Sequence, residues 1–140
     1  MKKLFFGLVS LLAVLGWSCS ESHDDLAYEY HAHILLPDST LKTFNDSMPI
    51  KVDFESHTGA PVHHIQLRIF NKSSLVEVYK KPEQEHVHAV SGEYLFQDVV
   101  LLNAANGFSP GSNWILEARV WGEEDGEEES VSTLEFQIKP

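Results

Sequence analysis

Residues 49–56 have the sequence PIKVDFES, and residues 62–70 have the sequence VHHIQLRIF. Apolar and polar residues alternate in both stretches, with apolar residues at Ile50, Val52 and Phe54 and at Ile65, Leu67 and Ile69. Successive side chains on a β-strand point to opposite faces, so this alternation predicts two strands that each bury one face. The intervening sequence HTGAP, residues 57–61, contains the Gly and Pro residues of a turn.

Similar alternation recurs in five further stretches, at residues 28–36, 75–79, 93–100, 114–120 and 134–138. The alternation shifts near Asp98, which predicts a β-bulge there. Polar connections are expected at 37–48, 82–92 and 102–113, and no stretch of useful length has a helical period. Seven strands without a helix predict an all-β, immunoglobulin-like seven-stranded antiparallel β-sandwich over residues 28–140, with a partly open barrel as the alternative.

The chain begins with the features of an export signal. Lys2 and Lys3 precede an apolar run from Leu4 to Leu15, which is too short to span a bilayer and has the length found in signal peptides. Gly16-Trp17-Ser18 then leads to Cys19, the only cysteine. This arrangement resembles the lipobox of bacterial lipoproteins, which implies that residues 1–18 are removed and that Cys19 carries lipid. Cleavage by the ordinary signal peptidase, leaving a thiol, is the alternative.

Residues 19–27 are expected to form a polar tether between the lipid and the domain. Its sequence SESHDD, residues 20–25, resembles the acidic export signal of surface lipoproteins in Bacteroidota-type bacteria. That resemblance implies an outer-membrane lipoprotein, and whether the domain faces the periplasm or the cell surface stays open. Without Lys2 and Lys3 the chain has 8 basic and 21 acidic residues, a net charge of −13. Nucleic acid is therefore excluded as a partner, because phosphate binding needs a basic face.

All eight histidines follow Cys19. His23 lies in the tether, and the other seven are His31, His33, His57, His63, His64, His86 and His88. Residues two apart on a strand point the same way, so His31 and His33 are expected to lie side by side on an outer face. Neutral imidazole is a good ligand for zinc, copper and nickel.

Strand direction brings these histidines together. Consecutive strands of such a sandwich alternate in direction, so the seven histidines of the domain are expected at one pole, near the acidic hairpin tip at 122–130. We therefore predict them as candidate ligands for zinc or copper. Solvated surface histidines are the alternative, and the acidic tip is expected to be a solvated turn. Met48 is the only methionine after Cys19, so a thioether site for Cu(I) is disfavoured.

Short motifs give a family resemblance. Gly92-Glu93-Tyr94 followed by Trp114-Ile115-Leu116 resembles the "GxY … WxL" ending of small exported bacterial Ig-like domains, including YtkA-like proteins. His31-Ala32-His33 is similar to the opening of copper-resistance CopC-like domains. CopC-like copper sites use a free N-terminal histidine, and a lipidated Cys19 at the mature N-terminus does not supply one.

No catalytic motif accompanies the histidines. The chain has no G-x-S-x-G, H-E-x-x-H or phosphate-binding Gly loop, so an enzyme is not expected. Two hypotheses remain: a membrane-anchored lipoprotein that binds zinc or copper, and a non-enzymatic adhesion or assembly module whose partner is a neighbouring surface protein. Trp121 has outer parity and is expected to be a sheet-edge residue or an exposed anchor for such a partner.

The first prediction concerns the anchor. Replacing Cys19 by alanine removes the only thiol to which lipid can be attached, so Cys19→Ala should abolish incorporation of labelled fatty acid. The protein should also leave the membrane fraction, as measured by fractionation and immunoblotting. Undiminished labelling of the variant would show that Cys19 is not the anchor.

Overall fold

The computed structural model describes residues 30–123 and 129–140. The predicted signal peptide, Cys19, the tether and most of the predicted acidic tip lie outside the described residues. The elements are β1 (Tyr30–Leu36), β2 (Ser47–Ser56), β3 (Val62–Asn71), β4 (Glu77–Lys81), β5 (His86–Ala89), β6 (Glu93–Leu101), the 3-10 turn η1 (Ala104–Asn106), β7 (Asn113–Trp121) and β8 (Ser130–Gln137). None of the described segments is a helix long and apolar enough to cross a bilayer.

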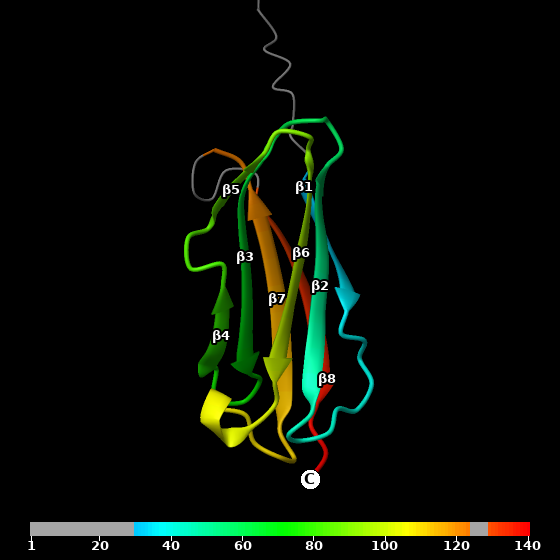
Figure 1. The fold of residues 1–140 in the computed structure, drawn as a ribbon, viewed down its shortest axis with the longest axis vertical. Coiled ribbons are helices and arrows are strands. Elements are labelled where there is room, and N and C mark those ends of the chain that lie inside the picture. The colour runs from blue at the N-terminus through cyan, green and yellow to red at the C-terminus, as the bar shows by residue number, and fades with distance from the viewer. Residues whose placement is uncertain (1–29, 124–128) are drawn as a thin grey trace, which may run out of the picture.

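The strands form two antiparallel sheets that face each other (Figure 1). The first sheet has the order β1-β2-β6, and the second has the order β4-β3-β7-β8, with β5 also paired to β3. Apolar side chains from both sheets fill the space between them, as the alternating patterns predict. The predicted immunoglobulin-like β-sandwich is therefore confirmed.

The core is formed by the inward positions named from the sequence. Side chains that are almost fully buried include Ile50, Val52 and Phe54 of β2, Ile65, Leu67 and Ile69 of β3, and Trp114, Leu116, Ala118 and Val120 of β7. The outward positions of the same strands carry the polar residues. The core is thus shared by the two sheets, and the histidines lie outside it.

Two local expectations are wrong. β6 pairs with β2 without a register shift from Glu93 to Leu101, so the bulge expected near Asp98 is absent from this pairing. The apparent shift in the pattern arises because Asp98 itself points between the sheets, where the hydroxyl of Tyr79 on β4 donates a 2.8 Å hydrogen bond to its carboxylate. A polar residue at an inward position is tolerated when it is hydrogen-bonded.

The second difference is β5, an eighth strand within residues 82–92, which were expected to form a loop. It lies along the same edge of β3 as β4, but at the opposite end of that strand. The structure thus places His86 beside His64 and at the end of the sandwich where β1 begins (Figure 1).

The turns at this end are held by a glycine. Gly92 has a positive φ of 77°, and a Cβ there would lie 3.2 Å from the carbonyl oxygen of Ala60. Its own carbonyl oxygen accepts a 2.8 Å hydrogen bond from the backbone N–H of Ser56 at the end of β2. The turn after β2 and the turn after β5 therefore contact each other directly, which requires glycine at this position.

The second prediction tests the inner faces. Leu67 and Leu116 are 0% exposed, whereas Leu95 on β6 is 47% exposed. Because truncation of a buried leucine leaves a cavity, Leu67→Ala and Leu116→Ala should each lower the free energy of unfolding by about 2–5 kcal/mol. Leu95→Ala should change it by less than about 1 kcal/mol. Chemical denaturation measures all three, and equal effects at buried and exposed positions would contradict these inner faces.

Candidate metal centre

The seven candidate ligands divide into two groups, one on each sheet. The first group lies on the outer face of β1 and at the end of β2, and consists of His31, His33 and His57. The second group lies where β3 and β5 pair, and consists of His63, His64, His86 and His88. Ring contacts hold each group together. Both groups lie at the end of the sandwich where β1 and β3 begin, which is uppermost in Figure 1.

Three residues of the second group converge on one point. His63, His86 and His88 each offer a ring nitrogen, and these three nitrogens lie within 4.8 Å of one another. A tetrahedral ion at 2.0–2.1 Å from each nitrogen needs nitrogens about 3.4 Å apart. Since His86 and His88 are exposed, modest side-chain rotation would close this difference. These three side chains therefore form a candidate three-histidine metal site.

His63 supplies a second sign of a ligand site. Its Nδ1 atom is buried and finds no hydrogen-bond partner among the described residues. A buried polar atom that lacks a partner costs about 1–3 kcal/mol, and an ion at the site is one way to satisfy it. His63 has the parity of a core residue, but it lies at the start of β3, where the ring contacts His88 at a centroid distance of 5.1 Å.

His88 is held in an unusual backbone conformation. Its φ is +52°, in the left-handed region that residues other than glycine rarely adopt. The pairing of β3 and β5 shifts register here, because Val62 pairs with Ala89 whereas His64 pairs with His86. The extra residue on β5 makes a bulge, and bulges re-aim side chains at functional sites. This conformation costs about 1–3 kcal/mol, and it also occurs at Asn45 and Leu75, outside the histidine groups.

Hydrogen bonds fix the ring of His86. The carbonyl oxygen of Gly122 can only accept, so Nδ1 of His64, 2.7 Å away, must donate to it. In neutral His64 the other nitrogen, Nε2, is then an acceptor, and it lies 3.3 Å from Nδ1 of His86. The His86 Nδ1–H therefore donates to His64, which leaves Nε2 of His86 as the nitrogen with a lone pair for an ion. This is how a partner outside the ligand set selects a ligand's tautomer.

The protonation of His86 also favours ligation. Partial loss of solvent lowers the pKa of His86 below its ordinary value, and repulsion from the neighbouring His64, His88 and His63 lowers it further. A histidine with a lowered pKa stays neutral to a lower pH. Because only neutral imidazole binds a metal, His86 keeps a nitrogen able to ligate at a pH where an ordinary histidine begins to protonate.

Trp121 holds His64 in place. The indole is only 2% exposed, so the alternative that Trp121 is an exposed anchor is wrong, and its strand β7 lies between β3 and β8 and not at a sheet edge. Its ring stacks on His64 at a centroid distance of 5.3 Å and an angle of 9°, and the guanidinium of Arg119 lies 5.6 Å from the indole centroid. These neighbours on the outer face bury Trp121 although its parity points away from the core.

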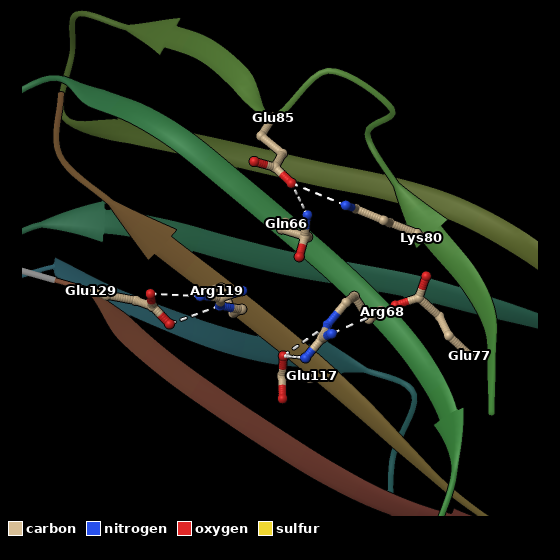
Figure 2. A network of polar contacts seen from close by, with 8 residues as sticks. All are labelled: Gln66, Arg68, Glu77, Lys80, Glu85, Glu117, Arg119 and Glu129. Carbon is tan, nitrogen blue, oxygen red and sulfur yellow. Dashed lines mark hydrogen bonds and ion pairs between the residues drawn. The ribbon is translucent and has the colours of Figure 1, made fainter. Parts of the chain in front are cut away.

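Arg119 belongs to a set of ion pairs on the outer face of the second sheet (Figure 2). It donates two hydrogen bonds to Glu129, of 2.7 and 2.6 Å, at the start of β8. These bonds lower the pKa of Glu129. Glu129 belongs to the expected acidic tip, of which residues 124–128 lie outside the described residues.

A second part of the same network fixes the start of β5. Glu85 accepts a hydrogen bond from Gln66 of β3 and lies 3.2 Å from the ammonium of Lys80 on β4 (Figure 2). Its backbone carbonyl also accepts a 2.9 Å bond from the N–H of Ile65. Side chain and backbone of Glu85 thus tie the residue before His86 to β3.

The group on the first sheet is built around a carboxylate. Oε1 of Glu55 lies 2.8 Å from Nε2 of His33 and 3.0 Å from Nε2 of His57. The hydrogen bond from His57 lowers the pKa of Glu55, and that from His33 lowers it further. The ring of His31 stacks on His57 at a centroid distance of 4.2 Å. Two imidazoles therefore bind one carboxylate, and a third packs against one of them.

Sequence reasoning placed the seven histidines but missed the residues that organise them. From the sequence, Glu55 was only an outward residue of a strand, two residues before His57. Its place opposite His31 follows from the pairing of β1 with β2. Trp121 and Gly122 directly follow the inward positions of β7, and nothing in the sequence pairs them with His64. That pairing depends on the register of β3 against β7.

No protein-family model matches the sequence, and no curated protein matches it. Among solved structures, the chain is similar to the CARDB domain of the PF1109 protein from Pyrococcus furiosus in complex with di-metal ions, with a TM-score of 0.52 and 12% identity over 80% of this chain and 94% of that one. A solution NMR structure of the same domain gives 0.51 and 14%, over 79% and 94%. Murine CRIg gives a TM-score of 0.41 and 13% identity, over 79% and 99%. At these identities the CARDB likeness shows the fold alone.

The third prediction tests the chain of bonds from Gly122 through His64 to His86 in the metal-free protein. At pH 8, long-range proton–nitrogen spectra should show both rings protonated at Nδ1. His64→Phe keeps a ring against Trp121 but removes both nitrogens, so His86 should lose its preference for Nδ1–H. His33→Phe, on the other sheet, is the matched control and should leave His86 unchanged. Protonation of His86 at Nε2 in the wild type would contradict the arrangement.

Proposed function

We propose that this chain is an exported, lipid-anchored lipoprotein whose domain binds a divalent transition-metal ion, zinc or copper, through His63, His86 and His88. The observation that carries the proposal is the convergence of three imidazole nitrogens within 4.8 Å of one another. The proposed role is binding and delivery rather than catalysis.

The donor set supports a borderline metal. Three neutral imidazoles suit Zn²⁺, Cu²⁺ and Ni²⁺, and a three-histidine set leaves a fourth position for water or for a ligand from a partner. Met48, the only methionine after Cys19, is 2% exposed in the core and cannot supply a thioether. The site therefore favours Zn²⁺ or Cu²⁺ over Cu(I).

The anchor and the site are close in sequence. Cys19 lies eleven residues before Tyr30, and β1 begins at the end of the sandwich that carries the histidines (Figure 1). Eleven residues span at most about 40 Å when fully extended. A lipid on Cys19 would thus keep the proposed ion near the outer membrane, within reach of a partner in the same membrane.

The CARDB domain supports the proposal only in a general way. That domain, which has the same fold, is described in complex with di-metal ions. Metal binding is therefore compatible with a sandwich of this kind. The ligands proposed for the present chain come from its own residues.

The fourth prediction is metal binding itself. Zn²⁺ or Cu²⁺ added to the full-length protein in detergent, after removal of metal by a chelator, should raise the melting temperature, since a ligand of the folded state stabilises it. At 100 times the dissociation constant the gain is about 2.7 kcal/mol. Binding should weaken as the pH falls from 7 to 5, because protons compete with the ion for the imidazole nitrogens. Calorimetric titration and thermal melts measure both effects.

Variants locate the site. His63→Ala/His88→Ala removes two of the three convergent ligands and should lose the tightest binding event. His23→Ala, in the predicted tether, is the matched histidine control and should bind as the wild type does. Absence of binding at millimolar metal would overturn the proposal and favour an adhesion or assembly module.

A further inference from the structure

We propose a second metal site on the opposite sheet, in which Glu55, His33 and His57 hold a divalent transition-metal ion. The inference extends the proposed function, because it assigns two ions to the domain in place of one. It rests on a different strand pair and on a different donor set, two imidazoles and a carboxylate.

Strand pairing assembles this second site. β1 and β2 are antiparallel, with His31 opposite Glu55 and His33 opposite Asp53. The neighbours Tyr30, Ala32 and Phe54 are buried, so the histidines and carboxylates all point away from the core. His57 follows β2 directly. The convergence is therefore fixed by the register of two strands.

Two of the three donor pairs already lie close to the spacing of ligands around an ion. Nε2 of His33 and Nε2 of His57 lie 2.8 and 3.0 Å from the same atom, Oε1 of Glu55. Ligands of a tetrahedral zinc ion are about 3.4 Å apart, so each pair would separate by about half an ångström. The donor atoms of His33, Glu55 and His57 do not all lie within 4.8 Å of one another, so the two imidazole nitrogens must also approach each other. Their side chains, each 50% exposed, leave room for that movement.

Binding of an ion at the second site changes where the ring protons of His33 and His57 lie. Both Nε2 atoms donate to a carboxylate that can only accept, so each carries a proton in the metal-free protein. In a neutral ring that proton moves to Nδ1 when Nε2 binds the ion, and an imidazolium releases one proton to solvent. The carboxylate of Glu55 exchanges two hydrogen bonds for one bond to the metal.

The charge on this face also favours a cation. Glu55 lies directly opposite Glu93 of β6, and Asp53 points to the same outer face. Like charges opposite each other on neighbouring strands are unfavourable. A divalent ion on Glu55 would offset that repulsion.

The two sites should differ in affinity. The ion at the second site must displace two hydrogen bonds from a carboxylate that is 30% exposed, whereas the site on β3 and β5 contains a buried nitrogen without a partner among the described residues. Zinc should therefore fill His63, His86 and His88 first, and the site at Glu55 second.

The experiment counts ions and assigns each one. Full-length protein in detergent is dialysed against zinc, and bound metal is measured by mass spectrometry together with calorimetric affinities. The wild type should bind two zinc ions. His33→Ala/His57→Ala should keep only the tighter one, and His63→Ala/His88→Ala only the weaker one.

Glu55→Gln separates ligation from charge. It keeps the shape of the side chain but removes the carboxylate, and it should weaken the second ion by about tenfold or more, since loss of even an outer-shell partner costs about 10–100-fold. Glu93→Gln removes the same charge from the opposite residue and should weaken it far less. Thermal melts of the metal-free variants confirm that each is folded.

The outcomes distinguish the two proposals. One ion in the wild type, lost with His63→Ala/His88→Ala, overturns the second site and leaves the proposed function intact. If the wild type binds one ion and only His33→Ala/His57→Ala loses it, the second site is supported and the first is overturned. A second ion that is insensitive to Glu55→Gln, or that responds equally to Glu93→Gln, overturns the inference.

Discussion

One edge of β3 is shared by two short strands, and the histidine group of the second sheet exists because of that division. Leu67 of β3 pairs with Lys81 of β4, so a continuous partner strand would place residue 86 opposite Val62, five residues earlier. Val62 instead pairs with Ala89. Two additional residues bring His86 opposite His64, where Gln84 would otherwise lie, and the bulge between His86 and Ala89 adds a third. Every contact of the proposed first site follows from this offset.

Polar contacts on the outer face hold that offset in place. Glu85 fixes the point at which the chain returns to β3. On the other side of β3, the Arg119–Glu129 pair lies beside Trp121, and Trp121 stacks on His64. Ion pairs on a sheet surface add little stability by themselves. Here their effect is positional, because they orient the rings that select the tautomer of His86.

The fold could be predicted from the sequence because alternation reports burial directly. The inward residues of β2, β3 and β7 are the ones that the pattern names. β5 was missed because four residues, two of them histidine, are too few to show a period. A bulge was predicted near Asp98 because one inward polar residue gives the same pattern as a change of register. An exposed Trp121 was considered because parity shows which way a side chain points, but not which residues cover it.

The candidate site could be predicted only as a set of residue types. The alternating direction of the strands predicted that seven histidines lie toward one end. The parity of a residue, however, shows only on which side of its own strand it lies, and not which sheet that strand joins. His33 and His86 therefore looked equivalent, although they lie on different sheets. Glu55 became a candidate ligand only once the pairing of β1 with β2 was known.

The left-handed backbone at His88 lowers the stability of the fold at a residue that we propose as a metal ligand. Glycine is the residue that this φ of +52° favours, and an L-residue there raises the free energy of the native state by about 1–2 kcal/mol. Glycine at this position would make the empty domain more stable and would remove a ligand. The free energy of unfolding of the domain is therefore lowest without a metal ion, and a further destabilising mutation is then least tolerated. A bound ion would offset the free energy lost at this histidine.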